Sequence, residues 1–93
     1  MDYEQKFNEL YEYFEKQIEM GDLHGDNFDR VDSVLALIYG VEDQASGIFY
    51  SLETDEEKRV FLQDFKNAVE HLRDGKEDSD EKVAEWVMGD REK

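Results

Sequence analysis

Ninety-three residues suffice for one domain with one hydrophobic core. The chain is 39% apolar and 40% charged, and its 26 acidic residues against 11 basic ones give a net charge of −15. Because this charge repels the phosphates of nucleic acids and an anionic membrane surface, both are excluded as direct ligands and we predict a basic protein as the partner.

The chain contains no cysteine, so disulfides, thiolate metal sites and a cysteine nucleophile are excluded. Its first residues, Met-Asp-Tyr-Glu, lack the basic and apolar regions of a signal peptide. No apolar run approaches the roughly 20 residues that span a bilayer. We therefore expect a cytoplasmic protein, in the host cytoplasm if a phage encodes it.

The first periodic segment predicts a helix over residues 3–18. Its apolar residues recur at i, i+4, i+7, i+8, i+11 and i+15, which places them on one helix face. Gly21 is the expected end of this helix, since glycine adopts the positive φ of a helix stop at little cost. The apolar residues are Tyr3, Phe7, Leu10, Tyr11, Phe14 and Ile18.

A second helix is predicted to begin after Asp26, whose carboxylate can cap free backbone N–H groups, and to stop at Gly40. Its apolar residues form one broad face. This width predicts that it is the central helix of the fold. The residues of the face are Phe28, Val31, Val34, Leu35, Leu37, Ile38 and Val41.

Residues 42–52 carry a weaker pattern, for which we favour a short helix, with a short strand over 48–52 as the alternative. Thr54 and Glu57 then form a capping box. The helix that follows is predicted to end near Gly75. Its buried face consists of Phe61, Leu62, Phe65, Ala68, Val69 and Leu72.

Residues 74–80 form a polar connector, and a short last helix is expected to stop at Gly89, with residues 89–93 frayed. We expect Trp86 in the core or in a dimer contact, and His71 at the surface or its boundary. The apolar residues of this last helix are Val83, Ala84, Trp86, Val87 and Met88.

These patterns together predict an all-α fold. With one core and short connections, we expect residues 1–93 to form a single acidic domain, a compact bundle of four to five helices.

The segment Gly21–Asn27 reads GDLHGDN and resembles the first metal-binding motif of the calcineurin-like metallophosphatases. The resemblance implies that Asp22 and His24 coordinate a catalytic metal. In that family the motif follows a buried strand and further motifs complete the site, whereas here it follows a helical stripe and His71 is the only other histidine. We therefore interpret the segment as a helix stop and N-cap loop, with no metal.

The segment from Asp74 to Glu85 carries several oxygen-bearing side chains and has the length of an EF-hand calcium loop. That loop requires glycine at its sixth position and an oxygen donor at its third, where this chain has Ser79 and Lys76. We interpret it as a solvated linker. Since no hydrolase or nucleotide-binding motif is present either, we predict neither enzymatic activity nor a cofactor.

The charge is concentrated in the first part of the chain. Residues 1–57 hold 16 acidic and 3 basic residues, net −13, while residues 58–93 hold 10 and 8, net −2. Like charges on one helix face repel, so we favour a binding role over solubility alone. The predicted partner-binding residues are Glu12, Glu15, Glu19, Asp22, Asp26, Asp29 and Asp32, with Tyr13 and Met20 as apolar contacts at their edge.

Carboxylates spaced along a rigid helix can imitate the phosphates of a duplex. We therefore expect an inhibitor that covers the basic groove of a nuclease or another DNA- or RNA-binding enzyme. As a class, it resembles the small acidic DNA-mimic inhibitors that phages use against restriction and CRISPR enzymes. The alternatives are an immunity protein or antitoxin that neutralises a basic toxin, and an acidic adaptor that dimerises through Ile48, Phe49, Tyr50 and Val60.

Overall fold

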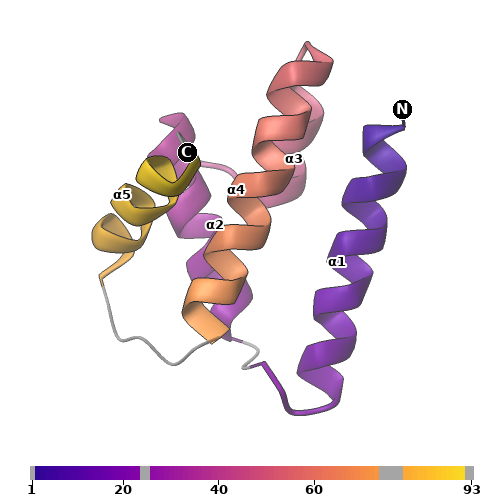
Figure 1. The fold of residues 1–93 in the computed structure, drawn as a ribbon, viewed down its shortest axis with the longest axis vertical. Helices are drawn as coiled ribbons and strands as arrows, with labels where there is room; N and C mark the ends of the chain where they lie inside the picture. Colours follow the sequence, from indigo (N-terminus) through magenta and orange to yellow (C-terminus); the bar gives the residue numbers. More distant parts are fainter. Residues whose placement is uncertain (1, 24–25, 74–78, 92–93) are drawn as a thin grey trace.

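The computed structural model describes residues 2–23, 26–73 and 79–91. These residues form five helices and no strand, which confirms the predicted all-α bundle (Figure 1). The helices are α1 (Tyr3–Glu19), α2 (Asp26–Tyr39), α3 (Ala45–Ser51), α4 (Asp55–Arg73) and α5 (Asp80–Arg91).

Helix α4 is the central element, because it packs against each of the other four helices. The prediction that residues 26–39 form the central helix was therefore wrong, although α2 also packs against α3, α4 and α5. Helices α1 and α4 lie side by side and run in the same direction (Figure 1). One long side of α1 consequently faces away from the bundle.

The helix ends follow from local side-chain and backbone chemistry. The Asp2 carboxylate accepts a hydrogen bond from the Gln5 N–H at 3.1 Å and caps α1. Gly21, with φ of 83°, ends the chain's first helical segment as predicted, and Gly40, with φ of 69°, follows α2. The Thr54 hydroxyl accepts from the Glu57 N–H at 3.1 Å, so the predicted cap of α4 is confirmed.

A cluster of aromatic rings joins α1, α3 and α4. The ring of Phe7 stacks on that of Phe49 with centroids 4.6 Å apart, and it lies 5.7 Å from the ring of Phe65. Phe14 also approaches Phe65, at 5.7 Å. All four rings are buried, and aromatic pairs at such separations add to the free energy of burial. This contact fastens α1 to the bundle.

Two residues predicted to belong to the apolar face of α2 are exposed instead. Leu37 is 51% exposed and Val41 is 45% exposed. The helix ends at Tyr39, and the Val41 N–H turns back to the carbonyl of Ala36 at 3.1 Å, so Val41 no longer continues the helical face. Asp26 is the first residue of α2 and not the residue before it, a shift of one position.

Helix α5 also differs from its prediction. It continues through Gly89 to Arg91, so Gly89 does not end it, and residues 92–93 of the segment predicted to fray lie outside the described residues. Trp86 is 42% exposed, which excludes the predicted core position. The helix docks through Val83, Ala84 and Val87.

A buried polar stripe runs along α4. Asp64, Asn67 and His71 occupy positions i, i+3 and i+7 and are buried, so the prediction of a surface or boundary histidine was wrong. The Tyr39 hydroxyl donates to Asp64 Oδ2 at 2.8 Å, and the His71 and Trp86 rings pack 4.5 Å apart. Helices α2 and α5 therefore cover this polar side of α4, including His71.

Candidate functional site: an acidic surface on two helices

Three of the predicted partner-binding residues lie together on α1. Glu12, Glu15 and Glu19 are exposed and line one shallow depression with Lys16. Their i, i+3 and i+7 spacing places them on one exposed flank of α1, beside the face that carries the core residues Phe7 and Phe14. The structure thus presents three carboxylates and one ammonium group to solvent on this flank.

The acidic surface continues from α1 to α2 across the side chain of Tyr11. The Tyr11 ring stacks on Phe28 of α2 at 5.1 Å. Burial raises the pKa of Tyr11, and the charges of Glu15 and Asp32 raise that pKa further. The stacked pair is therefore the place where α1 and α2 approach each other, and Glu15 and Asp32 are both near enough to influence the phenol.

Asp32 has a structural role as well as a charge. Its Oδ1 accepts a hydrogen bond of 2.9 Å from the N–H of Ala45, the first residue of α3. Burial raises the Asp32 pKa against the lowering effect of this hydrogen bond, and the charges of Asp29 and Asp43 raise it further. We define the acidic surface as the residues that these relationships connect, which are Glu12, Glu15, Glu19, Asp29, Asp32 and Asp43.

Asp22 and Asp26, also predicted to bind the partner, are exposed near the connection between α1 and α2. Neither residue lines the depression that Glu12, Glu15 and Glu19 share. Their place in the chain keeps them near its edge.

The two predicted apolar contacts are exposed but lie on the other flank of α1. Tyr13 is 54% and Met20 is 74% exposed. At about 100° per residue, Tyr13 continues the flank of Lys6 and Leu10, which borders α4, whereas Glu15 lies on the flank that borders α2. These two side chains therefore do not sit between the carboxylates of α1 and those of α2.

An apolar surface that the sequence analysis missed lies on α2. Asp29 and Ser33 are followed on the same exposed strip by Leu37 and Gly40, and Leu37 and Val41 form the apolar part of a depression of about 530 Å³. Glu42 and Asp80 lie at its rim. The signal was present in Gly40, whose positive φ turns Val41 away from the core.

Two of the four residues of the predicted dimer contact are buried inside the fold. Ile48 and Phe49 are buried in the core of the bundle. Tyr50 remains exposed and Val60 is partly exposed. A dimer that used all four residues would therefore require the core to open.

Metal ligands do not gather within the described ranges 2–23, 26–73 and 79–91. There, no group of three histidine, aspartate or glutamate side chains could hold a metal ion. His24 of the GDLHGDN segment and Asp74 of the calcium-loop candidate lie outside those ranges. None of the helices in them is long and apolar enough to span a bilayer.

Comparisons of the chain with models of protein families, with curated proteins and with solved structures gave no match.

Proposed function

We propose that the protein inhibits a nucleic-acid-binding enzyme by occupying its basic groove with the acidic surface of α1 and α2. The observation that carries the proposal is the exposed row of glutamates on α1, which the Tyr11–Phe28 stack joins to the helix that carries Asp29 and Asp32. Carboxylates held together against their own repulsion favour a positively charged partner.

The spacing of the carboxylates can be compared with that of a nucleic-acid backbone. Along α1, Glu12 and Glu15 are separated by about 4.5 Å of helix axis, and Glu15 and Glu19 by about 6 Å. One strand of a DNA duplex carries one charge per about 3.4 Å of axis. The α1 carboxylates are therefore sparser than the phosphates of one strand, and the carboxylates of α2 would have to add to them to resemble a duplex.

The apolar depression beside these charges supplies a second kind of contact. Leu37 and Val41 are exposed on the same helix that carries Asp29 and Asp32. Protein interfaces obtain much of their affinity from a few well-packed side chains, while charges raise the association rate. We therefore add Leu37 and Val41 to Tyr13 and Met20 as candidate apolar contacts of the interface.

The proposal is tested by inhibition of DNA cleavage. The full chain is added to a panel of purified restriction enzymes and CRISPR effector complexes, and cleavage of a cognate duplex is measured. DNA mimicry predicts that added competitor duplex relieves the inhibition and that raising the salt concentration weakens it steeply. The variant E12Q/E15Q/E19Q should lose most of the inhibition.

A matched variant controls for total charge. Glu53, Glu81 and Glu85 are exposed outside the acidic surface, so E53Q/E81Q/E85Q removes the same charge without changing that surface. Equal loss of inhibition in both triple variants would contradict a localised site. Inhibition that competitor duplex does not relieve would instead favour the antitoxin alternative, in which the partner's active site is covered without nucleic-acid competition.

A further inference from the structure

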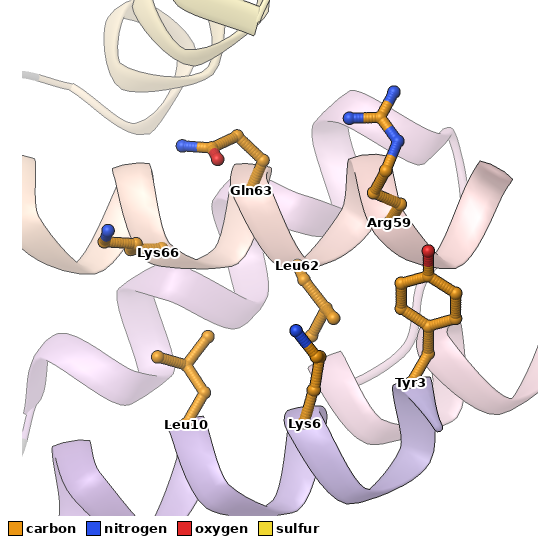
Figure 2. A pocket seen from close by; sticks show the side chains of 7 residues that line it. All are labelled: Tyr3, Lys6, Leu10, Arg59, Leu62, Gln63 and Lys66. Carbon is orange, nitrogen blue, oxygen red and sulfur yellow. The ribbon is translucent and has the colours of Figure 1, made fainter. Parts of the chain in front are cut away.

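A groove of opposite character lies on the other flank of α1. It has a volume of about 460 Å³ and is lined from α1 by Tyr3, Lys6 and Leu10 and from α4 by residues of one face. In Figure 2, Leu62 of α4 points down toward α1 and lies above the side chain of Lys6. The α4 residues of the lining are Arg59, Leu62, Gln63 and Lys66.

This groove concentrates positive charge in a chain that has little. Its lining includes three of the 11 basic residues and no acidic residue. Arg59 is paired with Glu56, but neither Lys6 nor Lys66 forms an ion pair with any residue that the structure describes. Two ammonium groups therefore border the groove without a charged partner from the protein.

The floor of the groove is apolar. Tyr3, Leu10 and Leu62 are partly buried and pack against the core, so each leaves apolar surface exposed in the groove. The volume lies in the range of about 300–1,000 Å³ that is typical of small-molecule sites. An occupant that satisfies both features needs an apolar body and a negative end.

We propose that the groove between α1 and α4 binds a small amphipathic anion, an aliphatic chain that ends in a carboxylate. The chain would lie on Leu10 and Leu62, with its carboxylate drawn into the groove by the positive charges of Lys6 and Lys66. Arg59 and Lys66 are seven residues apart, about 10.5 Å along α4, so cations extend along the groove and not only at one end. This site uses the flank of α1 opposite to the acidic surface and is independent of the proposed function.

Binding is tested with dodecanoate, below its micelle concentration, added to the ¹⁵N-labelled full chain. We expect saturable shifts of backbone resonances at Tyr3, Leu10 and Leu62, with the affinity measured by calorimetry. Dodecyltrimethylammonium and dodecyl maltoside have the same chain with a positive or neutral head. Both should bind at least tenfold more weakly at these residues, because they cannot pair with the lysines.

Paired lysine variants separate this site from general charge effects. K6Q/K66Q should weaken dodecanoate binding about tenfold or more, whereas K16Q/K82Q, which removes two exposed lysines outside the groove, should leave it unchanged. Circular dichroism of both variants checks that they fold. Equal weakening in both variants, equal binding of all three head groups, or shifts away from the groove would each overturn the proposal.

Discussion

The Tyr39 hydroxyl donates a 2.8 Å hydrogen bond to Oδ2 of Asp64, a carboxylate with no exposed surface in the middle of α4. This bond joins the last residue of α2 to the central helix. A buried carboxylate requires polar partners, because losing one leaves part of its desolvation cost without compensation. The pair therefore restricts how α2 and α4 can pack.

We predict that Y39F destabilises the protein by about 1–3 kcal/mol, because it leaves a buried carboxyl group without a hydrogen bond that it accepts in the folded state. Urea denaturation followed by circular dichroism measures the change. The exposed Tyr50 provides the control, and Y50F should alter the free energy of unfolding by less than about 0.5 kcal/mol. Similar stabilities of the two variants would show that the Tyr39 bond contributes nothing.

Substitutions of Asp32 separate its role as a cap from its charge. D32A removes the acceptor for the Ala45 N–H and should cost about 1 kcal/mol. D32N keeps an oxygen in the same place and removes a partly buried negative charge, so it should be close to neutral at pH 7. A D32N variant as unstable as D32A would mean that the charge itself is required.

The pH dependence of stability gives a second measurement on Asp32. Its pKa is raised above the ordinary 3.8, so the folded protein holds this proton more tightly than the unfolded chain does. Its contribution to the free energy of unfolding therefore falls as the pH rises through the interval between 3.8 and the raised pKa. Comparing thermal unfolding at several pH values in the wild type and D32N should show a smaller fall in the variant.

Repulsion within the acidic surface predicts that fewer charges stabilise the fold. At low salt, E12Q/E15Q/E19Q should increase the free energy of unfolding by a few tenths of a kcal/mol per like-charge pair removed. Its melting temperature should rise accordingly. Added sodium chloride should stabilise the wild type more than the variant, since salt screens exposed charges. Calorimetry at about 20 mM and about 500 mM salt, which lie below and above physiological ionic strength, tests this.

A lower melting temperature of the triple variant at low salt would contradict this account. E53Q/E81Q/E85Q serves again as the control, since it separates the local repulsion from the effect of net charge.

The exposure of Leu37 predicts that it is dispensable for folding. L37S and V41S should each change the free energy of unfolding by less than about 0.5 kcal/mol, whereas L35A should cost about 2–5 kcal/mol. Leu35 has no exposed surface and lies two positions away from Leu37 on the same helix. If urea denaturation gave a loss above about 2 kcal/mol for L37S, Leu37 would have to be packed in the core, which would contradict the observed exposure.

Sequence periodicity predicted the positions of α1 and α4 well because each presents one long apolar stripe. The i+4 and i+7 spacings that run from Phe7 to Phe14 and from Phe61 to Ala68 correspond to residues that are buried in the structure. Capping chemistry is also local, so the start of α4 at Thr54 followed from the sequence. Interactions within one or two helical turns can be read without knowledge of the neighbours.

The wrong predictions concern which sides of a helix are covered by neighbouring helices. His71 and Asp64 are polar, and nothing in the sequence of α4 indicates that α2 and α5 pack over them. Leu37 is apolar, yet it stays exposed in a depression whose lining includes Asp80, the first residue of α5. The acidic surface had the same limit. The glutamates of α1 followed from their spacing, whereas the contact of Tyr11 with Phe28 of α2 depends on how two helices meet.

The stacking of Phe7 on rings from α3 and α4 has a consequence for the order of folding during synthesis. Phe7 leaves the ribosome 54 residues before Phe61, which at about 5–20 residues per second is a delay of several seconds. Through that interval the apolar stripe of α1 lacks the α4 rings against which Phe7 and Phe14 pack. The glutamates on its exposed flank keep the nascent segment charged and oppose its aggregation until α4 emerges.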